Sequence, residues 1–276
     1  MTDKHHLIAD SGSTKTDWSL GDKRYKTQGI NPFHQTEKEI EVILQEELLP
    51  QIGSESQIER ISFYGSGVRP ELTSMMAGVL RRVFPEAAEV EAASDLLGAA
   101  RALCGQQEGI ACILGTGANS CLYDGRRIVR NIPPMGYILG DEGSGAALGI
   151  RLLNALYKER LPKYLLTLFE NEMQLSLPDV IGRVYRQSMA NRWLASLAPF
   201  VSAHLSDPAV EALVTDNFRS FISNNITPYQ RPDLCIHAVG SIAYHFSAQL
   251  QKAAAEQGYT LGRILRSPIE GLSELD

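Results

Sequence analysis

The sequence is short of cysteine, of basic charge and of long apolar runs, and each shortage excludes a class of protein. Its four cysteines form no Cys-x-x-Cys pair, which favours reduced, buried thiols over a disulfide framework. A formal net charge of −6 argues against a protein that binds nucleic acid or an anionic membrane surface. No run reaches the ~20 apolar residues of a membrane span, and we expect no signal peptide. These shortages predict a cytoplasmic protein whose partners include neither a membrane nor a nucleic acid.

Two common phosphate-binding motifs are also missing. The P-loop requires a glycine directly before its lysine, whereas Lys15 follows Thr14. The dinucleotide fingerprint requires a third glycine, which is absent after both Gly65-x-Gly67 and Gly115-x-Gly117. Any phosphate site in this chain must therefore be built in another way.

Apolar residues, by contrast, are plentiful. They make up 44% of the 276 residues, which is enough for a large core and for one large or two modest domains. The pattern divides into two α/β halves that separate near residues 105–109, and residues 161–226 read as helical throughout. Each half opens with a strand, a turn of small polar residues and a second strand.

Local signals place several helix ends. Thr36 and Glu39 have the spacing of a capping box, and the helix that follows is expected to end at Pro50 and Gly53. Ser94-Asp95 is expected to open a further helix directly after a strand.

The first strand-turn-strand unit, residues 6–20, has the features of a phosphate-binding hairpin. An apolar run ends on Asp10, which is placed to hold a metal ion through its waters. Gly12 allows the backbone to approach a ligand, and residues 14–16 add hydroxyls and a positive charge. An ordinary hairpin turn has a similar composition, so both interpretations stay open at this point. The turn at residues 115–120 repeats the pattern, and two such hairpins facing each other would grip a polyphosphate from both sides.

Together these segments resemble a known family. Residues 10–17, 115–120 and 238–241 resemble the first phosphate, second phosphate and adenosine motifs of the actin-like ATPase superfamily. Residues 29–34, Ser94-Asp95 and the Gly-Asp-Glu-Gly-Ser stretch at 140–144 resemble its N-acetylglucosamine kinase branch, which shares a fold with the BadF-type ATPases. The resemblance implies an α/β fold of two ribonuclease-H-like domains with an interdomain cleft. The domains would cover residues 1–105, with a tail at 268–276 that packs back on them, and residues 106–267 with a helical insertion.

The resemblance also implies roles for individual residues. Asp95 would be the catalytic base, although Ser94 or Asp95 could instead only cap the helix. Asp10 and Asp141 would hold Mg²⁺. The positions implied for ATP are Asp10, Gly12, Ser13, Thr14, Lys15, Thr16, Gly115, Thr116, Gly117, Gly240 and Ser241. The positions implied for the sugar are Asn31, His34, Ser66, Gly67, Asp95, Gly136 and Asp141. For Asn31 a plain turn, and for Asp141 a solvated surface loop, are the alternatives.

The function that follows is an ATP-dependent kinase of an N-acetylated amino sugar, with N-acetylglucosamine converted to its 6-phosphate. We also expect a homodimer. No structural metal site is expected, because the cysteine cluster of the zinc-binding sugar kinases is absent. Three alternatives remain open at this point. The chain could be a BadF-type activator of a dehydratase, a kinase of N-acetylmuramic acid or glucosamine, or a nucleotide-binding switch without a sugar. An activator would need exposed cysteines for an iron–sulfur cluster, and Cys112 lies inside an apolar run.

Overall fold

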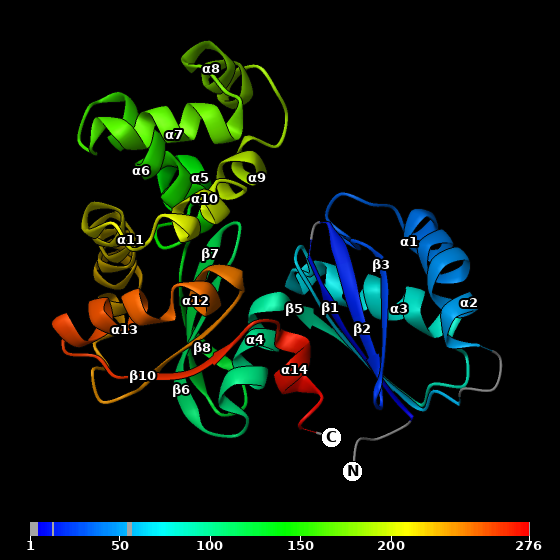
Figure 1. Ribbon diagram of the computed structural model, residues 1–276. Helices are drawn as coiled ribbons and strands as arrows, with labels where there is room; N and C mark the ends of the chain where they lie inside the picture. Colours follow the sequence, from blue (N-terminus) through cyan, green and yellow to red (C-terminus); the bar gives the residue numbers. More distant parts are fainter. Residues whose placement is uncertain (1–4, 13, 54–56, 276) are drawn as a thin grey trace. The chain divides into compact units, whose positions relative to one another are not determined.

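Two five-stranded sheets organise the chain, one in each of two units (Figure 1). The computed structural model describes residues 5–12, 14–53 and 57–275. Unit 1 comprises Met1–Gln107, Gly125–Ile128 and Ser267–Asp276, and unit 2 comprises Glu108–Asp124 and Val129–Arg266. This architecture confirms the predicted α/β class.

The sheet of unit 1 brings three strand ends to one level. Its strands, in the order β3-β2-β1-β4-β5, are β1 (His6–Ser11), β2 (Lys15–Leu20), β3 (Lys23–Gln28), β4 (Arg60–Gly65) and β5 (Glu89–Ser94). β1, β4 and β5 are parallel, with Ser11, Gly65 and Ser94 in register. The residues that follow these three strands therefore lie along one edge of the sheet, which is where ligands bind in open α/β sheets.

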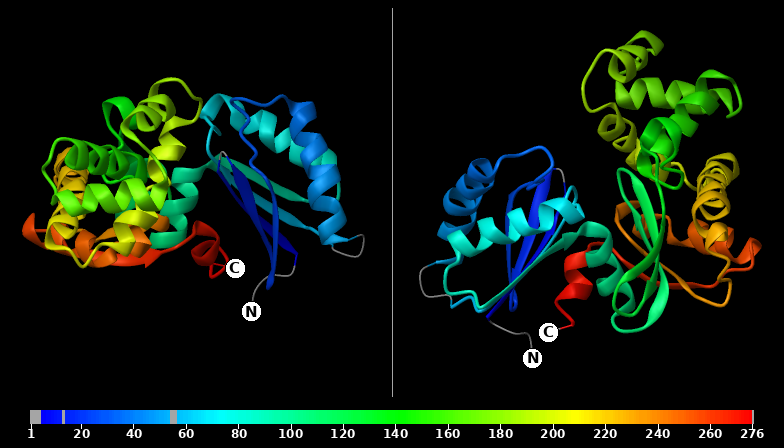
Figure 2. Two further views of the ribbon diagram at one scale, coloured as in Figure 1. Left: turned by 45° about the horizontal axis from the view of Figure 1, so that its top comes forward. Right: turned by 180° about the vertical axis from the view of Figure 1, so that it is seen from behind.

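Helices cover both faces of this sheet (Figure 2). One face carries α1 (Glu37–Ile43), the π-helix η1 (Leu44–Leu48), α2 (Leu49–Ile52), the 3₁₀ turn η2 (Pro70–Leu72) and α3 (Thr73–Val83). The other face carries α4 (Asp95–Cys104) and α14 (Pro268–Leu272). Because both faces are covered, β1 reads as a continuous apolar run. Trp18 and Phe63 are fully buried in the core beneath α1 and α3.

Two of the predicted helix starts are confirmed. Of the two residues that were expected to end the first helix, Gly53 does so and Pro50 does not. Thr36 and Glu39 form both bonds of the capping box at α1, and the Ser94 hydroxyl caps α4. Pro50, however, lies inside the helical segment, which continues to Gly53. In the π-helix η1 the Leu49 N–H donates to the Leu44 carbonyl, five residues earlier. The turn directly before Pro50 is therefore wider than an α-helical turn, and the helix continues past the proline.

The sheet of unit 2 has the same strand order as that of unit 1 when it is read from its other end, β8-β7-β6-β9-β10. Its strands, in the order β10-β9-β6-β7-β8, are β6 (Glu108–Leu114), β7 (Ala118–Asp124), β8 (Ile128–Ile132), β9 (Ile236–Val239) and β10 (Leu261–Leu265). β9 lies parallel to both β6 and β10. Val239 pairs with Ile113, so the turns after β6 and β9 meet at the same edge.

The helices of unit 2 fall into two groups. α12 (Ser241–His245) and α13 (Ser247–Glu256) pack on the sheet. Between β8 and β9 the chain forms α5 (Gly136–Leu139), α6 (Gly145–Tyr157), α7 (Lys163–Met173), α8 (Leu177–Tyr185), α9 (Ala190–Ala195), α10 (Ala198–Ala203), α11 (Pro208–Phe221), the π-helix η3 (Ile222–Ile226) and the 3₁₀ turn η4 (Thr227–Tyr229). The helical prediction for residues 161–226 is thereby confirmed.

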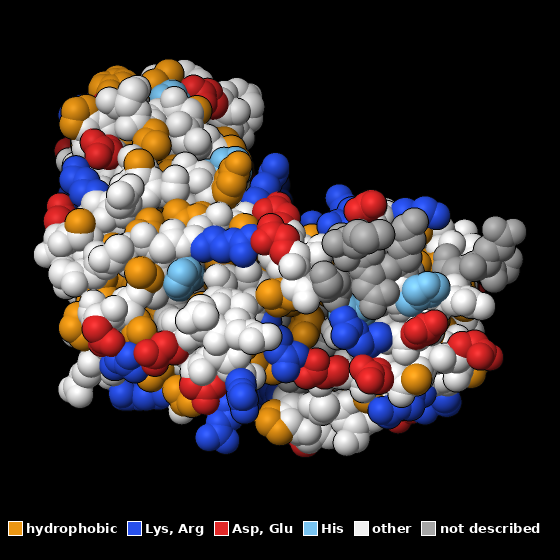
Figure 3. Space-filling model, turned by 90° about the horizontal axis from the view of Figure 1, so that it is seen from below, with side chains coloured by type: hydrophobic (Ala, Val, Ile, Leu, Met, Phe, Trp, Pro, Cys, Tyr) orange, Lys and Arg blue, Asp and Glu red, His pale blue; other side chains and the backbone are white. Residues whose placement is uncertain are grey.

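None of the helices among the described residues is long and apolar enough to cross a membrane. On the face shown in Figure 3, side chains of Lys and Arg are interspersed with those of Asp and Glu.

Candidate active site

The edge of the unit 1 sheet carries two half-buried aspartates. Asp10 lies near the end of β1, and Asp95 begins α4 directly after β5. The Ser94 hydroxyl accepts the Leu97 N–H at 3.3 Å and so caps the helix, while the Asp95 carboxylate accepts the Leu96 N–H at 2.8 Å. The cap and the proposed base are therefore different residues.

Burial makes both carboxyls weaker acids than exposed ones, and crowding of charge adds to this effect at Asp10. Burial first, then the negative charges of Asp95 and Asp17, raise the pKa of Asp10 to about 7, although Lys15 lowers it. Burial raises the pKa of Asp95, against the lowering effect of the Leu96 N–H. A site that concentrates negative charge in this way is suited to a cation or to the transfer of a proton.

The sequence analysis gave no role to Asp17, which the structure places in this cluster. Asp17 stands opposite Asp10 in the antiparallel pairing of β1 and β2, and its carboxylate binds the Lys15 ammonium at 2.6 Å. The sequence signal that could have indicated Asp17 is the register of the hairpin, because residues 10 and 17 pair across the turn. In this structure Lys15 is therefore directed at Asp17.

The turn of the hairpin is built as the small residues predict. The Gly12 N–H donates to the Lys15 carbonyl at 3.0 Å, and the Thr14 carbonyl accepts the Gly29 N–H at 3.1 Å. Ser13, also predicted to bind the nucleotide, lies outside the described residues. Thr16 is fully buried, and its hydroxyl lies 2.6 Å from that of Ser11. Thr16 is thus placed to support the hairpin rather than to expose its hydroxyl.

Ser11 and Thr16 together hold the loop that was predicted to bind the sugar. Both hydroxyl oxygens accept the Ile30 N–H, at 3.1 and 3.2 Å, and the Ser11 hydroxyl donates to the Ile30 carbonyl at 2.8 Å. The next residue, Asn31, accepts the Phe33 N–H through its side chain at 3.0 Å. The hairpin thereby determines where Asn31 lies.

Four of the predicted sugar positions lie in or next to this loop. Gly67 has φ +83°, and a Cβ there would lie 2.0 Å from the Asn31 side-chain oxygen, so only glycine leaves room for Asn31. The neighbouring Ser66 hydroxyl is buried without a hydrogen-bond partner among the described residues. His34 is exposed and lies edge-on to the Phe33 ring. An unpaired buried hydroxyl beside an amide side chain suits the hydroxyl groups of a sugar.

In unit 2, Asp141 meets the glycine turn after β6. A Cβ on Gly117 would lie 3.1 Å from one Asp141 carboxylate oxygen, and the other oxygen accepts the Ala118 N–H at 3.4 Å. Burial raises the pKa of Asp141, and the charge of Glu142 raises it further against a lowering by the Ala118 N–H. The carbonyls of Gly115 and Thr116 accept N–H groups from the start of α6. Gly136, the remaining predicted sugar position, is exposed at the start of α5 with φ +71°.

A cavity of about 680 Å³ opens beside this turn. Gly115, Thr116 and Ser241 line it, together with residues that the sequence analysis did not single out, namely Arg192, Ala195, Ser196, Ala198, Pro199, Ser202, Ala203, Ile242, His245 and Phe246. Apolar walls with a few hydroxyls and an imidazole are typical of pockets for a base and a ribose. Gly240 lets the turn after β9 pack closely against the end of β6. A Cβ added at Gly240 would lie 2.4 Å from the Leu114 carbonyl oxygen, and its φ is +121°.

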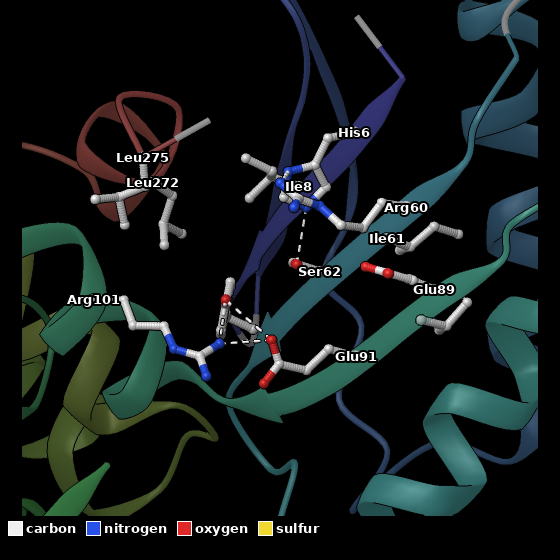
Figure 4. A pocket seen from close by; sticks show the side chains of 12 residues that line it. His6, Ile8, Arg60, Ile61, Ser62, Glu89, Glu91, Arg101, Leu272 and Leu275 are labelled. Carbon is white, nitrogen blue, oxygen red and sulfur yellow. Dashed lines mark hydrogen bonds and ion pairs between the residues drawn. The ribbon is translucent and has the colours of Figure 1, made fainter. Parts of the chain in front are cut away.

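Another cavity, of about 420 Å³, lies in unit 1, and none of the predicted site residues lines it (Figure 4). His6, Arg60 and Glu89 begin β1, β4 and β5, so the cavity extends from the end of the sheet opposite to Asp95. Its polar side chains bind one another, as when Arg101 donates to Glu91 at 2.6 Å. We assign it no part in the candidate site.

The donor set was also tested for a magnesium ion. Among the described residues, no group of three or more His, Cys, Asp or Glu side chains is placed to hold a metal by itself. Asp10 nevertheless supplies the hard carboxylate oxygen that Mg²⁺ prefers, and the crowded charges of Asp95 and Asp17 would be relieved by a cation. The site therefore fits an ion that arrives with phosphate and keeps several waters.

Comparison with solved structures identifies close relatives. A Porphyromonas gingivalis protein provisionally assigned as an N-acetylglucosamine kinase is 48% identical, with a TM-score of 0.93 over 98% of this chain and 97% of that one. A Chromobacterium violaceum protein with the same provisional assignment is 19% identical, with a TM-score of 0.68 over 99% of each chain. A ROK-family glucokinase from Streptomyces griseus, solved with glucose and AMPPNP, is 13% identical, with a TM-score of 0.56 over 98% of this chain and 97% of that one. The last two similarities show the fold alone. No protein-family model and no protein of curated function matches the chain.

Proposed function

The chain belongs to the N-acetylglucosamine kinase branch of the sugar kinases with the actin-like ATPase fold, and on this premise we propose that it phosphorylates N-acetylglucosamine on its 6-hydroxyl with ATP. The observation that carries the proposal is the junction of β5 and α4. There a half-buried carboxyl, Asp95, stands beside Asp10 on the same sheet edge that presents Asn31, Ser66 and Gly67. A base beside a set of hydroxyl-binding groups is what phosphoryl transfer to a sugar requires.

We assign the sugar to unit 1. Asn31 and the unpaired Ser66 hydroxyl would bind its hydroxyl groups, with His34 at the exposed end of the loop. Asp95 would accept the proton of the 6-hydroxyl as the oxygen attacks phosphorus. The burial that raises the pKa of Asp95 makes its carboxylate a stronger base than an exposed aspartate.

We assign the nucleotide to the turns of both units. The cavity beside Thr116 and Ser241 would hold adenine and ribose, and the turn at Gly115–Gly117 would hold phosphates through its backbone. Gly12, Ser13, Thr14 and Lys15 would hold phosphates from unit 1, and Thr16 would support that turn. Asp10 and Asp141 would hold the Mg²⁺ that accompanies ATP. Bound there, the ion would neutralise charge on the phosphate oxygens.

The dehydratase-activator alternative finds no support among the cysteines. Cys104, Cys112 and Cys121 are buried and Cys235 is half-buried, so the described residues present no pair of exposed thiols for a shared cluster. The homodimer and the cytoplasmic location stay predictions.

The direct test is ATP consumption by the purified chain with Mg²⁺ and a panel of sugars. The panel comprises N-acetylglucosamine, N-acetylmannosamine, N-acetylmuramic acid, glucosamine and no sugar. We expect N-acetylglucosamine to stimulate ADP release at least about tenfold over the other sugars, because buried polar groups discriminate strongly between hydroxyl patterns. Mass spectrometry and NMR should find the phosphate on the 6-oxygen. ADP release that no sugar increases would overturn the proposal, and a preference for another sugar would change the substrate.

A further inference from the structure

The loop Gly140–Gly145, which carries Asp141, is held by a helix far along the chain. We propose that Asn217 and Asn225, on the continuous element α11–η3, are positioning residues that keep Asp141 in the geometry that phosphoryl transfer needs. The inference rests on the proposed function, since it takes Asp141 to be part of the kinase site. It assigns a purpose to part of the helical insertion between β8 and β9.

The loop needs outside contacts to keep its conformation, because its backbone is strained at Asp141. Asp141 has φ 55°, in the left-handed region that a residue with a Cβ rarely adopts, whereas Gly143, with φ 81°, adopts that region freely. A strained conformation such as that of Asp141 persists only where surrounding contacts over-determine it. Something must therefore hold residues 141–144.

Asn217 supplies the first of these contacts. It is fully buried in α11, and its side-chain oxygen accepts the Gly143 N–H at 3.3 Å while its amide donates to the Ser144 carbonyl at 3.2 Å. Both ends of one amide thus bind the backbone of two successive loop residues. Ser144 in turn caps α6 by accepting the Ala147 N–H at 3.0 Å.

The asparagines of η3 supply the second set of contacts. The Glu142 carboxylate accepts the Asn224 amide at 2.7 Å and the Asn225 amide at 3.3 Å. Asn225 is buried, whereas Asn224 is exposed and contributes less. These two hydrogen bonds hold Glu142 against η3, and Glu142 directly follows Asp141 in the sequence.

These contacts come from one face of one element. Asn217, Phe221 and Asn225 follow one another at four-residue spacing, and a Cβ on Gly143 would lie 2.7 Å from the Phe221 Cβ. π-Helical turns such as η3 are frequent at functional sites. The same turn is tied to β7, because the Ser120 hydroxyl lies 3.2 Å from the Asn225 carbonyl and 2.8 Å from the Tyr229 hydroxyl.

As a consequence, one element, α11–η3, contacts both the strand that follows the Gly115–Gly117 turn and the loop that carries Asp141. β7 begins directly after the Gly115–Gly117 turn, and α11–η3 holds both β7 and the Asp141 loop. α11–η3 therefore helps to set the distance between the Asp141 carboxylate and Gly117 from outside the loop, together with the bond from the Gly145 N–H to the Gly115 carbonyl. Loss of a contact should let Asp141 move while ATP and the sugar still bind through other groups.

The test compares Asn217→Leu, which has a similar volume but no hydrogen bonds, with Thr215→Val as the control. Thr215 is also buried in α11, but its hydroxyl donates only to the Glu211 carbonyl of the same helix. We expect N217L to lower kcat by at least about tenfold with smaller changes in both KM values, and T215V to stay within about twofold of wild type. Melting temperatures of both variants are recorded beside the kinetics.

A double-mutant cycle separates positioning from general destabilisation. If Asn217 acts through Asp141, then N217L combined with D141N should lose little more than D141N alone. Additive losses, or an N217L variant that matches T215V in kcat, would overturn the proposal. If N217L does not fold, Glu142→Gln replaces it. This change keeps the length of the side chain but sets an amide against two amide donors, and we expect the same loss and the same coupling to Asp141.

A failure of the proposed function is distinguishable from a failure of this inference. If wild type phosphorylates no sugar, the kinase proposal fails first, and hydrogen exchange then decides the inference. We expect the Gly143 and Ser144 amides to lose protection in N217L but not in T215V. Equal protection in both variants would show that α11 does not hold the loop.

Discussion

At the scale of single residues, the start of α4 separates two functions that a helix N-terminus often combines. The Ser94 hydroxyl caps the helix, while the Asp95 carboxylate accepts the Leu96 N–H in a half-buried setting beside Asp10. The cap and the proposed base are adjacent in sequence, so substitutions can separate helix stability from the proposed catalysis.

Asp95→Asn should therefore lower kcat by about 10²–10⁴-fold, which is the usual contribution of a general base. The sugar should still bind, because an amide can hold the hydroxyl. Ser94→Ala is the matched control, since it removes the cap at a cost of about 1 kcal/mol but keeps the base. Steady-state kinetics and melting curves of the two variants should show opposite patterns, and full activity of D95N would refute the assignment of the base.

The thiols make a second prediction at this scale. Burial raises the pKa of Cys104 to about 11 from an ordinary value near 9, and only the thiolate is nucleophilic. The half-buried Cys235 should thus react with a disulfide reagent first at neutral pH, and Cys104 only on unfolding. Because the folded pKa lies above the unfolded one, the folded state should lose stability as pH rises from 9 towards 11. Rapid reaction of all four thiols in the folded chain would contradict this.

At the scale of secondary-structure elements, glycines in α6 decide how closely α9 approaches. A Cβ on Gly149 would lie 2.2 Å from the Leu194 carbonyl, and one on Gly145 would lie 3.0 Å from the Ala195 Cβ. α9 contributes Arg192 and Ala195 to the proposed nucleotide cavity. The packing of two helices therefore sets the position of one cavity wall.

Gly149→Ala should push α9 outward and raise the KM for ATP by about tenfold with little change in the KM for the sugar. Gly182→Ala in α8 is the control, because none of the described residues beyond its own turn of helix would lie within 4 Å of the added Cβ. There the better helix propensity of alanine should raise stability by up to about 1 kcal/mol. Isothermal titration with a non-hydrolysable ATP analogue checks the difference, and equal affinities in the two variants would contradict the role of the helix contact.

At the scale of the whole molecule, the chain passes repeatedly between its two units, at residues 107–108, 124–125, 128–129 and 266–267. Most of the proposed sugar residues belong to unit 1, whereas Gly136, Asp141 and the proposed adenosine cavity belong to unit 2. Phosphoryl transfer brings the two ligands to one place, and kinases of this kind must also exclude water to avoid wasting ATP.

We therefore expect ligands to contract the molecule. Small-angle scattering should show a smaller radius of gyration with N-acetylglucosamine and a non-hydrolysable ATP analogue together than with neither ligand. N-acetylmannosamine, if the kinetic test shows it to be a poor substrate, is the matched control and should give less contraction. An unchanged radius with both ligands bound at saturation would argue against closure.

The sequence by itself determined the local features. The strands, the capping box at Thr36, the cap at Ser94 and the helical character of residues 161–226 follow from side-chain periodicity and hydrogen bonds between near neighbours, which act within a few residues. The assignments of Asp10, Asp95 and Asp141 came from motifs at the ends of strands and on the glycine-flanked loop, and they stay predictions until tested.

Only the tertiary structure decided what meets across the chain. The hairpin register placed Asp17 beside Asp10, the π-turn before Pro50 carried the helix past that proline, and α11–η3 supplied the contacts that hold the Asp141 loop. The walls of the proposed nucleotide cavity come from the Gly115-Thr116 turn, from the neighbouring helices α9 and α10, and from α12, and these three segments lie far apart in sequence. Such contacts depend on packing and on charges brought close by the fold, and a linear pattern of residues contains neither of these.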